Sequence, residues 1–143
     1  MAVSYDEVEV GTEISAQTYG VSRGQLVQYA GASGDFNIIH WNERFAKAVG
    51  LPDVIAHGMF TMATAARLVT DWVGDPAAVL EYGVRFSSMV PVPDDDQGTS
   101  LVVSGTVEEK LEGKRVIVGL TARAGAADGA KVLTQARAIV QLS

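Results

Sequence analysis

A short part of the chain holds the side chains best suited to acid–base chemistry. Asp35 and His40 lie in one short segment, with Asn37 between them. The pair His57-Gly58 follows and precedes an apolar stretch. A carboxylate and an imidazole within reach of one substrate can move its protons, and backbone N–H groups at a helix start can stabilise an oxyanion. This combination predicts a site that abstracts a proton next to a carbonyl group.

The apolar stretch predicts a helix over residues 58–73, in which only Arg67 and Asp71 are charged. A helix that is apolar over most of its circumference must be covered on several sides. Gly74 is expected to end it, because glycine readily adopts the left-handed conformation of helix C-termini, and Pro76 follows. Gly58 then lies in the first turn of a buried helix.

Two shorter helices are expected before this long one. The first covers residues 22–32 with Ser22 as its N-cap, and the second covers residues 43–49. The apolar side of the first helix is expected to contain Leu26, Val27 and Tyr29. The segment 35–40 therefore crosses as a loop between two helices, where a rigid scaffold often holds catalytic groups.

The second half of the chain has the two-residue period of β-strands. A strand with one buried face is predicted from the alternating apolar residues Leu80, Tyr82, Val84 and Phe86. Prolines and aspartates make residues 91–98 a loop. Further strands are predicted over residues 100–110, 115–123 and 131–142 as an antiparallel meander, joined by a shorter strand over 13–20. A curved sheet around the apolar helix is an α+β fold with the hot dog architecture.

Composition narrows the domain count and the partners. The 143 residues suffice for one domain with a core, so we expect a single domain over 1–143. The net charge of −6, with eleven scattered Lys and Arg, argues against nucleic acid as a partner. No apolar stretch approaches membrane-spanning length, and residues 1–10 lack the pattern of a signal peptide. The absence of Cys is compatible with a reducing compartment, so we expect a cytoplasmic location. The lack of a spanning stretch leads us to expect no membrane partner.

Two motifs carry a family resemblance. The motif Gly-Asp-x-Asn-x-x-His at 34–40, followed by Ala-His-Gly-Met at 56–59, resembles the signature of MaoC-like, or (R)-specific, enoyl hydratases and 3-hydroxyacyl dehydratases. With further matches at 72–76 and 90–93, the chain is similar to the catalytic beta subunit of actinobacterial (3R)-hydroxyacyl-ACP dehydratases of long-chain fatty acid elongation. The family usually has proline where this chain has Ile38. Since proline fixes φ, we expect a somewhat less pre-organised loop here.

The resemblance implies reversible dehydration of (3R)-hydroxyacyl thioesters to trans-2-enoyl thioesters, in fatty acid elongation or related acyl or polyketide metabolism. His40 would take the C2 proton, and Asp35 would hold the hydroxyl or the departing water. The backbone N–H of Gly58 would stabilise the enolate oxygen. The expected substrate-binding residues are Asn37, His57 and Met59. The thioester would be carried by CoA or by an acyl carrier protein (ACP), and neither a cofactor nor a metal ion is expected.

Each assignment has a structural alternative. Gly-Asp-x-Asn is also common turn chemistry. His57 serves equally well as a cap or staple at the helix start, and Met59 as core packing or as lining of an acyl tunnel. Asp35, His40 and His57 supply three possible metal ligands, but their spacing matches no familiar metal motif.

Two other function classes fit a hot dog domain. Acyl thioesterases act on the same thioesters but generally use a carboxylate-centred site. A noncatalytic acyl-binding subunit would serve a partner enzyme, and it would not need both Asp35 and His40. A small domain of this kind leaves a sheet edge exposed, so we expect a dimer of two copies or a heterodimer with a paralogous hot dog subunit.

Overall fold

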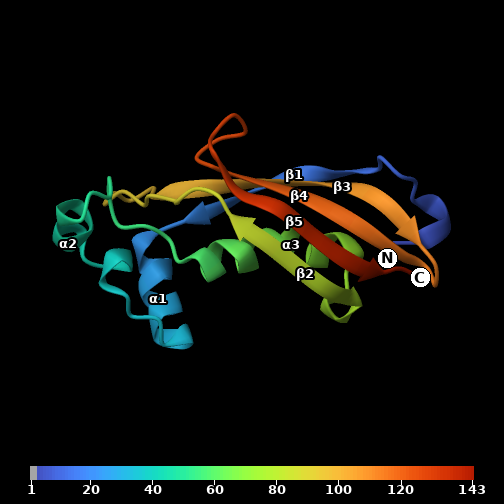
Figure 1. Cartoon of the computed structure of the whole chain (residues 1–143), viewed down its shortest axis with the longest axis horizontal. Coiled ribbons are helices and arrows are strands. Elements are labelled where there is room, and N and C mark those ends of the chain that lie inside the picture. The colour runs from blue at the N-terminus through green and yellow to red at the C-terminus, as the bar shows by residue number, and fades with distance from the viewer. Residues whose placement is uncertain (1–2) are drawn as a thin grey trace.

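The computed structural model describes residues 3–143, in which five antiparallel strands form one sheet (Figure 1). The strands are β1 (Glu13–Val21), β2 (Val79–Phe86), β3 (Thr99–Leu111), β4 (Arg115–Ala124) and β5 (Lys131–Gln141). Their order across the sheet is β1-β3-β4-β5-β2. The predicted meander of the last three strands is confirmed, and β1 joins the same sheet as predicted, where it pairs with β3. This order leaves β1 and β2 as the two edges.

The helix α3 (Gly58–Val73) lies against one face of the sheet, with the bounds predicted from its apolar pattern (Figure 1). It ends where Gly74 adopts a left-handed φ of 75°. The core cluster contains Ala65, Leu68, Val69 and Val73 of the helix and Val103, Val107, Val116, Val118 and Leu120 of the sheet. Each such Leu or Val contributes about 1.5–3 kcal/mol through burial. The predicted α+β hot dog fold is therefore confirmed. Within residues 3–143, no helix is long and apolar enough to cross a membrane.

The short helices gather at the end of the molecule where α3 begins (Figure 1). They are α1 (Arg23–Ser33), α2 (Glu43–Ala48) and the 3₁₀ helix η2 (Ile38–His40), while η1 (Tyr5–Glu7) and η3 (Pro76–Ala78) lie elsewhere. The predicted N-cap is confirmed, because the Ser22 side chain accepts a hydrogen bond from the backbone N–H of Gln25. The prediction for Val27 is wrong: it is exposed, because α1 is covered only along the side that carries Leu26 and Ala30.

Strand β2 departs from the predicted alternation. Leu80 and Phe86 are about half exposed, whereas Tyr82 and Val84 are partly buried. An edge strand has a neighbour on one side only, and its register against β5 shifts near Leu80 and again near Gln135. Gln135 has a left-handed φ of 47°, as expected for a bulge. The prediction of one buried face for all four alternating residues is therefore wrong in this chain.

The N-terminal segment is tied to the sheet through Lys110 of β3. Its ammonium donates to the backbone oxygens of Tyr5 at 2.9 Å and Val8 at 2.6 Å, and lies 4.1 Å from the centre of the Tyr5 ring.

Residues 1 and 2, on which the signal-peptide prediction partly depends, lie outside the described residues.

Candidate active site

His40 ends the helix η2 and is buried, with a backbone group holding its ring. Its Nδ1 lies 2.6 Å from the carbonyl oxygen of Ile55. A carbonyl oxygen can only accept a hydrogen bond, so Nδ1 carries the proton in the neutral ring. The lone pair is then on Nε2, which leaves that nitrogen able to act as a base.

The carbonyl that holds His40 belongs to a segment fixed on both sides. The backbone N–H of Ile55 donates to the oxygen of Ile39 at 3.2 Å, and that of Ala56 donates to the oxygen of Val90 at 2.9 Å. The segment therefore lies like a short strand between η2 and the loop after β2. Among residues 3–143, no side chain hydrogen-bonds to the His40 ring, so its tautomer depends on this backbone geometry.

Arg23 connects the elements around this segment. Its guanidinium donates to the backbone oxygen of Val92 at 3.0 Å, to Glu43 at 2.8 Å, and to Asp53. These partners come from the loop after β2, from α2, and from the segment that leads to Ile55. One partly buried arginine thus joins the start of α1 to three other parts of the site's scaffold.

Asp35 follows Gly34, which ends α1 with a left-handed φ of 75°. The Asp35 carboxylate accepts a hydrogen bond from the backbone N–H of Asn37 at 3.2 Å, and the Asn37 side chain accepts one from the N–H of Ile39 at 3.4 Å. The turn chemistry expected for this tetrapeptide is therefore present. It also holds the exposed carboxylate near the ring of His40.

His57 lies behind this pair. Its ring stacks on that of His40, with centroids 3.8 Å apart and planes at 25°, and Tyr29 packs on it at 4.7 Å. Its Nε2 donates to the backbone oxygen of Asp35 at 3.1 Å. Burial lowers the pKa of His57 and outweighs the hydrogen bond to the Asp35 backbone, which raises it; the neighbouring His40 has a smaller lowering effect.

A cavity of about 380 Å³ opens beside His40. Its lining residues are His40, Ile55, Ala56, Gly58, Thr61, Phe86, Ser87, Ser88, Met89, Val90 and Val132. A Cβ atom at Gly58 would lie 3.1 Å from the Phe86 ring, so that ring covers the glycine directly. The first N–H groups of α3 have no partner within the helix and are available to a ligand here.

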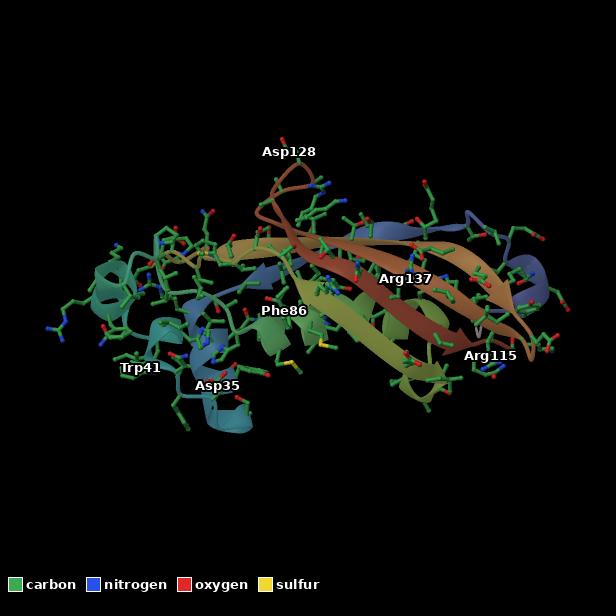
Figure 2. All side chains as sticks on the ribbon, viewed as in Figure 1. Asp35, Trp41, Phe86, Arg115, Asp128 and Arg137 are labelled. Atoms are coloured by element: carbon green, nitrogen blue, oxygen red, sulfur yellow. The ribbon has the colours of Figure 1, made fainter. Side chains whose placement is uncertain are left out.

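The structure brings the predicted site residues to one end of the molecule but not all to this cavity. Figure 2 shows Asp35 and Phe86 toward the start of α3, and Arg115 at the opposite end. His40 and Gly58 line the cavity, whereas Asp35, Asn37, His57 and Met59 do not. Met59 is 56% exposed.

Two contributors to the site, the Ile55 carbonyl and the Phe86 ring, could not be found from residue types and spacing. The carbonyl of Ile55 gives no signal in residue types, because every residue has one. Phe86 was predicted to face the core, and only the structure places its ring over Gly58.

Three side chains come close enough to suggest a metal site. One carboxylate oxygen of Asp35 and one ring nitrogen each of His40 and His57 lie within 4.8 Å of one another. Backbone carbonyls, however, already bind Nδ1 of His40 and Nε2 of His57, and the two rings stack face to face, unlike the ligands of a tetrahedral metal site. The arrangement favours acid–base chemistry over metal binding.

The fold and this geometry define a hot dog domain in which an aspartate and a histidine lie together near the start of the central helix. Residues 6–126 match the family described as MaoC like domain, and the chain belongs to that family. The predicted resemblance to MaoC-like hydratases and dehydratases is therefore confirmed. The narrower resemblance to the actinobacterial elongation subunit stays a prediction.

Three similar proteins illustrate the relationship. A 3-hydroxyacyl-thioester dehydratase X of Mycobacterium tuberculosis is 44% identical over 73 residues, covering 51% of this chain and 25% of the relative. A solved structure described as a MaoC-like dehydratase has a TM-score of 0.93 and 41% identity, covering 99% of this chain and 43% of that one. The R-hydratase PhaJ1 of Pseudomonas aeruginosa has a TM-score of 0.83 and 26% identity, covering 99% and 86%. The chain spans 4% to 25% of the first curated relatives that it matches.

Proposed function

We propose that this chain is a hydro-lyase that reversibly dehydrates (3R)-hydroxyacyl thioesters to trans-2-enoyl thioesters. The observation that carries the proposal is the state of His40, whose Nδ1 is bound to a backbone carbonyl, which leaves Nε2 as a base in a ring that lies beside the Asp35 carboxylate. Two relatives are named for the two directions of this reaction, as a 3-hydroxyacyl-thioester dehydratase and as an R-hydratase.

The two side chains complete the reaction without consuming a proton. In dehydration, Nε2 of His40 takes the proton from C2, and the electron pair of the C2–H bond becomes the new C2=C3 bond. The C3–O bond breaks, and the imidazolium returns its proton to the departing hydroxyl, so that water leaves. Asp35 accepts a hydrogen bond from that hydroxyl. In hydration the same pair positions and deprotonates a water molecule.

Gly58 stabilises the charge that forms on the thioester oxygen. Its N–H lies in the first turn of α3, where the helix dipole adds positive potential. Removing one such donor typically costs about 2.7–4 kcal/mol of transition-state stabilisation. The glycine lines the cavity together with His40, so one substrate can contact both.

The acyl chain lies in the cavity, whose walls include Ile55, Phe86 and Val132. Asn37 and Met59 remain proposed substrate contacts on the exposed side of the site. The carrier is CoA or ACP, and the cytoplasmic location stays a prediction.

A partner subunit completes the cavity. Phe86 and Met89 line it and are each about half exposed in the single chain. Their exposure beside the free edge of β2 supports association with a second copy or with a paralogous hot dog subunit.

A product assay tests the function. The purified chain is incubated with crotonyl-CoA and with a longer trans-2-enoyl thioester on CoA and on ACP, and the loss of enoyl absorbance and the chirality of the product are measured. We expect the (3R)-hydroxyacyl thioester. Release of free thiol indicates a thioesterase, and no turnover on either carrier favours the noncatalytic subunit.

Two variants connect the activity to the proposed pair. Asp35→Asn and His40→Gln are expected to lower kcat by about 10²–10⁴-fold, the usual contribution of a general acid or base. Circular dichroism should show an unchanged fold. Asp128→Asn is a matched control, because Asp128 lies at the tip of the β4–β5 loop, away from the site (Figure 2). Near wild-type turnover in either site variant contradicts the assignment.

A further inference from the structure

His57 takes part in none of these steps, although its side chain is only 1% exposed and lies at the centre of the site. Burying an imidazole costs free energy unless its ring nitrogens are hydrogen-bonded. Within residues 3–143, Nδ1 of His57 has no hydrogen-bond partner. Packing alone would favour an apolar ring at this position, so the imidazole needs a functional explanation.

His57 contacts or adjoins all three proposed catalytic residues, Asp35, His40 and Gly58. Nε2 of His57 donates to the backbone oxygen of Asp35, and its ring stacks on that of His40. His57 also precedes Gly58 in the chain, and its own backbone oxygen accepts from the N–H of Thr61 at 3.1 Å, which starts the hydrogen bonding of α3.

We propose that His57 is a positioning residue that holds Asp35, His40 and the first turn of α3 in one arrangement. This inference rests on the function proposed above. His57 does not line the cavity, so its effect is on the geometry of the catalytic groups and not on substrate contact.

Burial favours the neutral form of the His57 ring, because it lowers the pKa of this group. The titratable groups that face it are His40 on one face, Tyr29 at 4.7 Å, and Asp35 through both its backbone oxygen and its carboxylate, which opposes the shift. Two positively charged imidazoles do not stack favourably, so the stacked pair favours at most one imidazolium. When His40 holds the C2 proton, a neutral His57 presents an aromatic face to the imidazolium, which attracts the charge.

Two variants separate the hydrogen bond from the stacking contact. His57→Phe keeps a ring against His40 but removes the donor to Asp35, whereas His57→Gln keeps an N–H donor but removes the ring. We expect each to lower kcat by about tenfold or more, because displacement of a catalytic group by about 1 Å can cost that much. KM is expected to change less than about twofold, because the variants alter no cavity wall. The melting temperature of His57→Phe should stay close to that of the wild type or exceed it.

Thr64→Val is the matched control. Thr64 is buried in the same helix, donates to the backbone oxygen of Phe60, and does not line the cavity. Its variant perturbs packing and is expected to leave kcat unchanged. A folded His57→Phe variant with wild-type kcat overturns the positioning role while the hydratase function stands.

Hydrogen exchange distinguishes this inference from the proposed function. If His57 holds the backbone of Asp35, the amides of residues 34–40 exchange faster in His57→Phe than in His57→Gln, and faster in both than in the wild type. This readout needs no turnover, so it decides the positioning role even if the wild type acts on no thioester. Unchanged exchange in both variants overturns the proposal.

Discussion

His40 and His57 stack on each other but have different surroundings. His40 lines the cavity, whereas His57 is enclosed between His40 and Tyr29. Each ring donates one N–H to a backbone carbonyl, which fixes both tautomers in the neutral state. At the scale of single residues, the site therefore consists of one base that a substrate can reach and one ring that supports it.

Gly58 and Phe86 form a second contact that can be tested. Gly58→Ala adds a methyl group 3.1 Å from the Phe86 ring, which is exposed enough to move aside. We expect little change in stability, but a fall in kcat of about 10- to 100-fold as the ring shifts at the site. Steady-state kinetics and thermal melting measure the two effects.

The double variant Gly58→Ala, Phe86→Leu provides the control for this prediction. Leucine removes the ring that the new methyl group would meet, so part of the activity should return relative to Gly58→Ala. If Phe86→Leu makes the alanine variant no better, the steric explanation is wrong.

The pKa of His57 predicts how stability depends on pH. Burial lowers this pKa in the folded chain from the ordinary value of 6.5. Below that pH the unfolded chain binds a proton that the folded His57 does not bind, so the free energy of unfolding falls as the pH drops toward the folded-state pKa. Above it the effect is absent. Urea denaturation at several pH values between about 7.5 and 5.5 measures the slope.

His57→Phe is the comparison for this pH dependence, because phenylalanine cannot bind a proton. Its free energy of unfolding should fall less than that of the wild type over the same range. The other titratable groups contribute to both proteins and cancel in the difference. Equal losses in the two proteins contradict the assignment to His57.

At the scale of elements, Arg23 joins the start of α1 to α2, to the Asp53 side chain ahead of Ile55, and to the loop after β2. Arg23→Gln removes the guanidinium from Asp53 and from Glu43, of which Glu43 keeps its pair with Lys47. We expect a loss of about 2 kcal/mol in the free energy of unfolding, since hydrogen bonds to charged groups contribute about 1.5–3 kcal/mol. Turnover should also fall, because the segment that holds His40 loosens. Chemical denaturation and kcat measure these effects.

Arg137→Gln is the matched control for Arg23. Arg137 pairs with Glu108 at 2.8 Å, but their side chains are 65% and 40% exposed. Exposed ion pairs contribute little, so this variant should change the free energy of unfolding by less than about 1 kcal/mol. Equal effects of the two substitutions would show that Arg23 has no special structural role.

The elements that local chemistry defines could be predicted from the sequence. Ser22 and Gly74 mark helix ends through their own side chain or backbone freedom, and the apolar pattern of 58–73 requires a covered helix. The motifs also led to Asp35 and His40, which the structure places together. The Ile55 carbonyl could not be predicted, because a backbone group has no sequence signature. The exposure of Phe86 depends on strand order, which alternation within one strand does not contain.

At the scale of the whole molecule, the free edge of β2 predicts association. Leu80 and Phe86 expose apolar surface along this strand, and an unpaired strand edge offers N–H and C=O groups to a partner. We expect a dimer with twice the 15.1 kDa mass of one chain. Sedimentation velocity at micromolar concentration measures it.

Leu80→Asp tests whether β2 forms the interface. A charge buried against a second chain is costly, so this variant should be a monomer with low turnover. Val27→Asp is the control, because Val27 is equally exposed but lies on α1. A wild-type monomer contradicts the homodimer, and a dimer that survives Leu80→Asp places the interface elsewhere.

Backbone carbonyls, and not side chains, accept the hydrogen bonds of the two histidine rings, and this affects how the site can evolve. A point mutation exchanges a side chain and leaves the carbonyl oxygens of Asp35 and Ile55 in the chain. Position 55 can therefore vary without deleting the group that sets the tautomer of His40, whereas position 35 also carries the proposed catalytic carboxylate. Substitutions in the cavity wall, for example at Ile55, can change the substrate preference while His40 stays available as the base. Proton chemistry and substrate choice are thus inherited as separable traits.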